Sequence, residues 1–121
     1  MGDFKDLRVW QKGHAFACDA YRACMLLPAS EQFGLSQQLR RAAISIPANA
    51  AEGNGRLSKR DQARFFQIAV GSSREVEALL LLARDLNLLP AEVVTPLLTQ
   101  LADVQRSLSA LIAYCTRPSE G

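Results

Sequence analysis

The strongest constraint on the fold is an apolar seam in the last third of the chain. Between residues 91 and 116, apolar side chains recur at alternating steps of four and three in an unbroken heptad pattern: Leu97, Leu101, Val104, Leu108, Leu111 and Cys115. This spacing places them on one face of an α-helix, and such a face is stable in water only when it packs against other helices. The seam therefore predicts a helical bundle whose last helix covers residues 91–116.

Three further segments, residues 6–27, 31–52 and 59–86, have the same helical periodicity. The expected buried stripe of the first comprises Leu7, Trp10, His14, Ala17, Tyr21 and Cys24. The stripe of the second comprises Leu35, Leu39, Ala42, Ile46 and Asn49, and that of the third comprises Phe66, Ala69, Ser73, Val76, Leu80 and Ala83. Few residues are β-branched or aromatic, so the composition favours helix over sheet.

Local signals set the expected ends of these helices. Pro28 ends the first helix, because proline disfavours helical geometry in the residue before it. Ser30 and Ser58 are the expected N-caps of the second and third helices. Glycine after a helix end adopts left-handed backbone angles at no steric cost, so the run Gly53-Asn54-Gly55 is expected to stop the second helix. Pro47 lies inside that helix and predicts a bend.

Four helices joined by short loops predict an all-α, antiparallel, up-down-up-down four-helix bundle. A length of 121 residues suits one domain covering residues 1–121, with residues 117–121 as a frayed tail. Small residues gather on one surface of the second helix and on one surface of the third, and they predict a close approach of these two helices. They are Ala42, Ala43 and Ser45 on the second, and Ala69, Gly71, Ser72 and Ser73 on the third.

Composition narrows the cellular setting. No apolar run is long enough for a membrane-spanning helix, and the first residues lack the pattern of a secretory signal, so neither a membrane nor secretion is expected. The three cysteines, Cys18, Cys24 and Cys115, are scattered and odd in number. Reduced thiols in a cytoplasmic protein explain them best.

Motifs for catalysis or cofactor binding are not found in the sequence. His14 is the single histidine and lies on the apolar stripe of the first helix, so we expect a partly buried structural histidine. No Glu-x-x-His or Cys-x-x-Cys spacing supports a metal site, and the pair Gly53 and Gly55 lacks the third glycine of a dinucleotide fingerprint. We therefore expect neither a metal nor a cofactor, and no enzymatic activity.

Polar residues gather on facing positions of the second and third helices: Ser45, Asn49, Glu52, Ser72 and Glu75. One interpretation is a hydrogen-bonded network that fixes the register of the two helices. The other is a binding site near Pro47. Because nothing nearby completes a catalytic set, the structural network is the preferred interpretation.

Positive charge is concentrated in the middle of the chain. Residues 36–64 contain six basic residues against two acidic ones, a net charge of +4, whereas residues 75–121 carry a net charge of −3. The basic residues are Arg40, Arg41, Arg56, Lys59, Arg60 and Arg64. They form either a solvated surface, a patch that binds the phosphates of RNA or DNA, or one half of an interface with the acidic part of a neighbouring subunit.

Three motifs in order along the chain resemble those of a known family. The first is Phe4-Lys5-Asp6-Leu7-x-Val9-Trp10-Gln11-Lys12. The second is Phe33-Gly34-Leu35-x-x-Gln38-Leu39-Arg40-Arg41-Ala42-Ala43-x-Ser45-Ile46-Pro47-x-Asn49-x-Ala51-Glu52-Gly53. The third is Phe65-x-x-Ile68-Ala69-x-Gly71-Ser72, followed by Glu75.

These motifs resemble the bacterial four-helix-bundle family encoded by intervening sequences of 23S ribosomal RNA genes, which is similar in turn to the accessory variability protein of diversity-generating retroelements. The resemblance implies an up-down bundle that assembles into a ring-like homopentamer. For the retroelement type it also implies binding to nucleic acid and to a reverse transcriptase. A protein-interaction scaffold without nucleic-acid binding remains the alternative.

Overall fold

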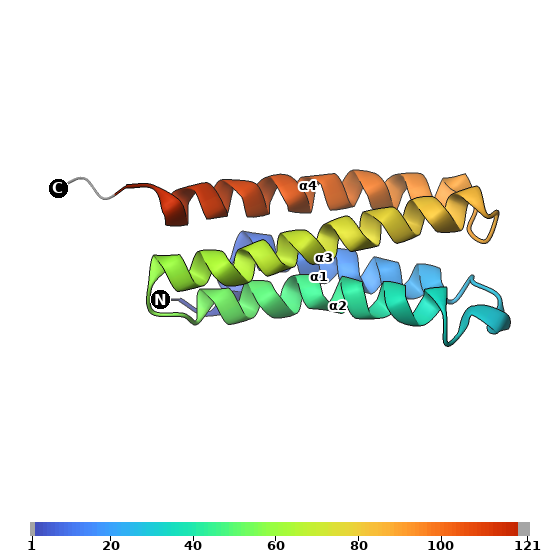
Figure 1. Ribbon diagram of the computed structural model, residues 1–121, viewed down its shortest axis with the longest axis horizontal. Helices are drawn as coiled ribbons and strands as arrows, with labels where there is room; N and C mark the ends of the chain where they lie inside the picture. The colour runs from blue at the N-terminus through green and yellow to red at the C-terminus, as the bar shows by residue number, and fades with distance from the viewer. Residues whose placement is uncertain (1, 119–121) are drawn as a thin grey trace.

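The computed structural model describes residues 2–118, and these form four antiparallel α-helices without a β-strand (Figure 1). The helices are α1 (Arg8–Cys24), α2 (Leu35–Asn54), α3 (Lys59–Asp85) and α4 (Ala91–Thr116). Two short 3₁₀ turns, η1 (Phe4–Asp6) and η2 (Ala29–Glu31), precede α1 and α2. The predicted all-α four-helix bundle is confirmed. Of the predicted tail, Arg117 and Pro118 follow α4, and residues 119–121 lie outside the described residues.

The helices pack in the cyclic order α1, α2, α3, α4, with α4 returning to α1. The α2–α3 interface is the most extensive and the α1–α4 interface is the thinnest. The α2–α3 loop lies at the same end of the bundle as the start of α1 and the end of α4, whereas the other two loops lie at the opposite end (Figure 1). Residues far apart in the sequence therefore meet at each end of the bundle.

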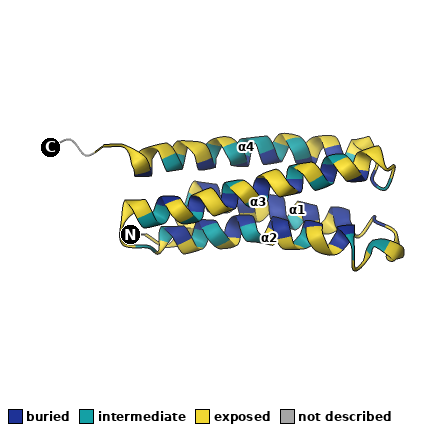
Figure 2. Ribbon diagram, in the orientation of Figure 1, coloured by how far each residue is buried: buried dark blue, intermediate teal, exposed yellow. Residues whose placement is uncertain are grey.

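The core confirms three of the four predicted stripes (Figure 2). Its largest buried side chains are Phe16, Phe66, Leu39, Ile46, Leu80, Leu89, Leu101 and Leu108. The stripe predicted for the first helix is partly wrong, because His14 and Tyr21 are exposed and the buried face is centred on Val9, Phe16 and Ala20. Alanines occupy several sides of this helix, so the hydropathy pattern alone did not define which side packs against the other helices.

Glycines let α2 approach both of its neighbours. A Cβ atom on Gly13 of α1 would lie 3.2 Å from Cγ2 of Ile46 and 3.7 Å from the backbone nitrogen of Pro47. One on Gly53 would lie 2.7 Å from Cε1 of Phe66 on α3. The predicted glycine stop is thus wrong in mechanism: Gly53 is buried inside α2, and Gly55, which follows the helix, has a right-handed φ of −82°. The helix also continues through Pro47, which is buried.

The small-residue faces of α2 and α3 meet as predicted, with Ala42, Ala43, Ala69 and Ser73 buried. Gly71 does not take part, since it is exposed and a Cβ atom there would find nothing within 4 Å. Its neighbours along the helix, not the glycine itself, make the close contact.

Two helix starts differ from the predictions. The first helix begins at Arg8 after η1 and ends at Cys24, short of residue 27. The second begins at Leu35, because residues 29–31 form η2 and Ser30 is no N-cap; Glu31 instead accepts a hydrogen bond from the Leu35 amide through Oε1 at 3.3 Å. The predicted cap of the third helix is confirmed, with Ser58 Oγ accepting from the Asp61 amide at 3.0 Å.

The α3–α4 turn depends on Asn87, the only residue between 2 and 118 with a positive φ, at 58°. The Leu88 amide donates to the carbonyl of Ala83 at 2.8 Å, and the Asn87 amide donates to that of Arg84 at 3.0 Å. This is the bonding of a Schellman motif, in which asparagine takes the left-handed position that is usually glycine.

Candidate functional site

The six basic candidates do not form one surface. Arg40 and Arg41 lie in the first half of α2, whereas Arg56, Lys59, Arg60 and Arg64 lie around the loop that follows it. Thirteen residues of helix separate Arg41 from Asn54 at the end of α2, which is about 20 Å at 1.5 Å per residue, and Arg56 lies beyond that end. The predicted patch therefore divides into two, and only the group at the α2–α3 loop gathers several cations.

Arg40 is occupied locally. Its Nε donates to the carbonyl of Ser36 at 3.3 Å and its Nη2 to that of Gln32 at 3.4 Å, while the guanidinium lies 5.9 Å from the ring centroid of Tyr21. Arg41 is exposed and makes no hydrogen bond or ion pair with the described residues. Arg40 thus stabilises the start of α2, and Arg41 is available to solvent.

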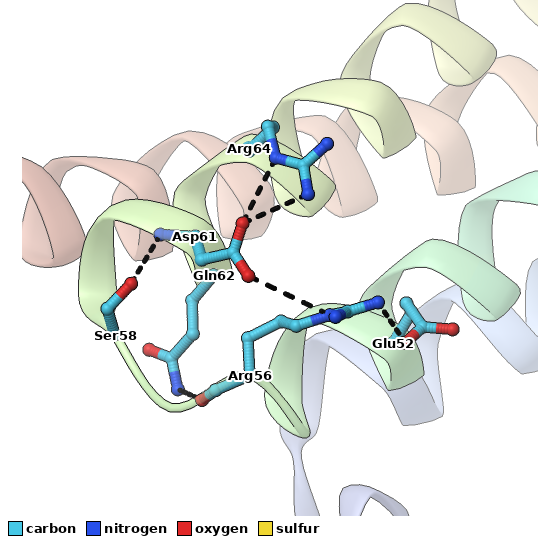
Figure 3. A network of polar contacts seen from close by, with 6 residues as sticks. All are labelled: Glu52, Arg56, Ser58, Asp61, Gln62 and Arg64. Atoms are coloured by element: carbon cyan, nitrogen blue, oxygen red, sulfur yellow. Dashed lines mark hydrogen bonds and ion pairs between the residues drawn. The ribbon is translucent and has the colours of Figure 1, made fainter.

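At the other end, an ion-pair network joins the end of α2 to the start of α3 (Figure 3). Arg56 Nη2 lies 2.7 Å from Glu52 Oε2, and Arg56 Nε lies 3.9 Å from Asp61 Oδ2. Arg64 completes the series, with Nη2 3.0 Å from Asp61 Oδ1. Gln62 donates to the carbonyl of Arg56 at 3.0 Å, which ties the loop to the first turn of α3.

Phe65 supports the same two arginines. The guanidinium of Arg56 lies 4.5 Å from its ring centroid and that of Arg64 lies 4.7 Å from it. Nε of Arg56 is buried and has no hydrogen-bond partner among the described residues. Cation–π contacts and carboxylates therefore hold Arg56 and Arg64 in place, and their main contribution is to the geometry of the loop.

Lys59 and Arg60 differ from these two. Lys59 Nζ lies 4.5 Å from the ring centroid of Tyr114 on α4, and Arg117, just after α4, contacts the same ring at 5.7 Å. Arg60 is exposed, without an ion pair to residues 2–118. Sequence reasoning missed Arg117, although the antiparallel topology places the end of the fourth helix beside the start of the third.

An open cleft of about 920 Å³ lies among these groups. Its walls include Arg56, Ser58, Arg60 and Arg64 from the α2–α3 side and Cys115 and Thr116 from α4. Asp61 is its acidic residue. With Lys59 and Arg117 beside it, this end of the bundle has more positive than negative side chains and suits an anionic ligand.

The predicted polar network holds three of its five members. Ser45 Oγ and Ser72 Oγ lie 2.6 Å apart across α2 and α3, and Asn49 Nδ2 donates to the carbonyl and hydroxyl oxygens of Ser45 at 2.8 and 2.9 Å. Glu52 was wrongly included, because it is exposed and pairs with Arg56. Glu75 is also exposed, and it lines a shallow polar cleft of about 430 Å³ beside Arg41, without a hydrogen bond to the described residues.

Polar contacts on two other interfaces were not predicted. On the α3–α4 interface, Gln105 Nε2 donates to Ser73 Oγ at 3.3 Å and to Glu77 Oε1 at 3.1 Å. On the thin α1–α4 interface, Lys12 Nζ lies 3.2 Å from Asp103 Oδ2.

His14 is not the partly buried histidine that the sequence predicted. It is exposed, its ring stacks on Trp10 with centroids 4.7 Å apart, and its Nε2 lies 3.9 Å from Sγ of Cys18. Within residues 2–118, no group of three or more histidine, cysteine, aspartate or glutamate side chains is arranged to hold a metal ion.

Fold and surface together define a class: an all-α antiparallel four-helix bundle with a basic end. A family model described as 23S rRNA-intervening sequence protein matches residues 5–110. The chain belongs to this family, as the resemblance of its motifs suggested. The expected likeness to retroelement accessory proteins stays a prediction.

A solved structure has the same fold. It is a crystal structure of a protein with unknown function from the S23 ribosomal protein family of Bacteroides thetaiotaomicron VPI-5482. The two chains are 25% identical, the alignment covers 86% of this chain and 97% of that one, and the TM-score is 0.80. A comparison with curated proteins gave no match. Across the described residues, none of the helices combines the length and hydropathy that crossing a membrane would require.

Proposed function

We propose that this protein is a non-enzymatic, self-associating bundle of the cytoplasm that binds the phosphate backbone of RNA or DNA at its basic end. One observation carries the proposal. Arg60 lies exposed in the cleft at this end, without a carboxylate partner among residues 2–118, while Lys59 and Arg117 lie nearby on Tyr114. Cations in an open surface contact phosphates and carry no base recognition.

The expected binding is weak for one subunit and sensitive to salt. If Lys59, Arg60 and Arg117 each neutralise one phosphate of a single strand, the slope of log K against log salt is about −2. Raising the salt from about 50 to about 200 mM then weakens binding about 20-fold. Self-association would repeat the patch on each copy and raise the overall affinity through multivalency.

Self-association is supported by large apolar side chains that remain exposed on the single chain. Leu57 is 98% exposed, and Met25 and Phe33 are each 82% exposed. Apolar side chains that gather on one surface mark places that another protein covers, and Met25 and Phe33 both lie in the connection between α1 and α2. A homopentamer is the assembly that the family resemblance implies, and its mass under native conditions tests this number.

A matched pair of charge reversals tests the nucleic-acid proposal. Arg60→Glu should weaken binding of a labelled single-stranded RNA by about tenfold, because it removes an attraction and adds a repulsion at the patch. Arg41→Glu is the control, since Arg41 is also exposed and without a partner among residues 2–118 but lies in the first half of α2. No binding even at low salt, or equal losses for both variants, would refute a patch at this end.

The second candidate is a protein-interaction scaffold without nucleic-acid binding. The pairing of Arg56 and Arg64 with Glu52 and Asp61 favours it, because those charges are already neutralised within the chain. Here Arg60 would pair with an acidic residue of a neighbouring subunit. Loss of the oligomer in Arg60→Glu, with RNA binding unchanged, would favour the scaffold. A reverse transcriptase as partner rests on the resemblance to the retroelement type and is tested by co-purification.

A further inference from the structure

Cys18 and His14 lie one helical turn apart on α1 and face each other. Sγ of Cys18 is 3.9 Å from Nε2 of His14. The histidine ring is held in place by stacking on Trp10 at an interplanar angle of 21°, and Trp10 packs edge-on against Phe4 at 5.0 Å. The packing of these rings therefore positions a nitrogen base beside a thiol.

Both side chains open into a groove between α1 and α2. The groove has a volume of about 430 Å³ and is lined mainly by apolar groups. Its other residues are Ala17, Tyr21, Arg22, Ile44 and Pro47. A small molecule with an apolar or aromatic part can reach the thiol along this surface.

The other two cysteines have different surroundings. Cys24 and Cys115 are buried, and burial raises the pKa of both thiols. Sγ of Cys24 donates to the carbonyl of Ser36 at 4.0 Å, and that of Cys115 donates to Oε1 of Gln62 at 3.8 Å. Thiols of this kind react slowly, because the thiolate is the reactive form and burial disfavours it; Cys115 lies in the wall of the cleft at the basic end but is only 6% exposed. Cys18 alone combines partial exposure, a neighbouring base and an open groove.

We propose that Cys18 is a site of thiol–disulfide exchange, with His14 as the proton acceptor and a small disulfide bearing an apolar group as the reaction partner. Nε2 of neutral His14 takes the proton of the Cys18 thiol, and the thiolate attacks one sulfur of the disulfide. A new sulfur–sulfur bond forms to Cys18 as the original one breaks. The other half leaves as a thiolate, which takes up the proton from the imidazolium.

The product carries the transferred group against Ile44 and Pro47, on the joint surface of α1 and α2. Ile44 is exposed in the single chain, so this surface is open to partners. Modification of Cys18 thus changes the shape and polarity of this groove without disturbing the core. This inference does not depend on nucleic-acid binding at the basic end, and the two can fail separately.

The test uses the full chain and 4,4′-dithiodipyridine, a neutral aromatic disulfide whose released thiopyridone is followed by absorbance. We expect one fast equivalent per chain, mapped by mass spectrometry to Cys18, at least about tenfold faster than the remaining thiols. Cys18→Ser should abolish the fast phase, while Cys115→Ser should leave it unchanged. His14→Gln should slow the fast phase about fivefold or more, because the proton acceptor is lost.

Three results would overturn the proposal: a fast adduct on Cys24 or Cys115, equal rates for all three thiols, or a Cys18 rate unaffected by His14→Gln. The last would mean that Cys18 is merely accessible. His14 is exposed, so its replacement should leave the fold intact, which far-UV circular dichroism checks. Should that variant unfold, His14→Asn takes its place, and a Cys18 rate equal to that of the wild type would again overturn the proposal.

Discussion

Gly53 is the position where the structure makes its sharpest prediction about stability. Replacement by alanine adds a methyl group 2.7 Å from Cε1 and 3.0 Å from Cδ1 of Phe66, and 3.2 Å from the carbonyl oxygen of Gln62. Phe66 is 2% exposed and belongs to the core, so its ring cannot move aside without displacing its neighbours. Overpacking of this kind costs about 1–3 kcal/mol, which exceeds the gain of about 1 kcal/mol in helix propensity.

Gly71 is the matched control, because it has the same residue type inside a helix but open space around it. A Cβ atom there meets nothing within 4 Å, so Gly71→Ala should stabilise the fold by about 0.5–1 kcal/mol. Gly53→Ala should destabilise it by up to about 2 kcal/mol, the difference between the two terms, which lowers the melting temperature by up to about 8 °C.

Urea unfolding followed by circular dichroism, at one fixed protein concentration, measures both variants. A fixed concentration matters because self-association would add to the apparent stability. If Gly53→Ala were as stable as Gly71→Ala, the close approach of α2 and α3 at Phe66 would be wrong.

Three further predictions concern single contacts. Ser72→Ala should lower the unfolding free energy by about 1 kcal/mol, since Ser45 loses its partner across α2 and α3; no change in the urea midpoint would contradict a role in register. Asn87→Ala should cost about 1 kcal/mol because of the positive φ, whereas Asn87→Gly should be nearly neutral; equal losses would point to the side chain instead of the backbone. Burial raises the pKa of Cys24 and Cys115 above the unfolded value of 9.0, so at alkaline pH the folded state binds more protons than the unfolded state. The free energy of unfolding should therefore fall as the pH rises above 9.0. Replacing both cysteines by alanine should flatten this dependence on pH, and an unchanged slope would refute the linkage.

The polar contacts show how far sequence reasoning could go. Facing positions on two antiparallel helices were enough to bring Ser45, Asn49 and Ser72 together. Glu52 could not be assigned in the same way, because its partner depends on where α2 ends and how the loop turns. Once the loop is in place, Arg56 lies one helical turn beyond Glu52 and takes its charge.

The basic residues illustrate the same limit. The count of charges along the sequence placed Arg40 and Arg41 in one group with the four basic residues at the α2–α3 loop. In the structure, the remaining length of α2 separates the two sets. Conversely, Arg117 is distant in sequence but lies with Lys59 on one aromatic ring. Along a helix each residue adds about 1.5 Å, so residues counted as one group in the sequence can lie far apart. Across an antiparallel bundle, residues that are distant in the sequence can meet.

The amino-acid sequence by itself determined the helices, their antiparallel order and the family, because helical periodicity is local and repeats over many residues. The tertiary structure decided which glycine permits close packing, which arginines are already paired and which cysteine faces a base. These three assignments depend on contacts between helices. A shift of one residue in the register of two helices, or of one turn in a helix end, changes which side chains are in contact. The prediction for His14 shows this directly: its helix was correct, and its surroundings were set by packing.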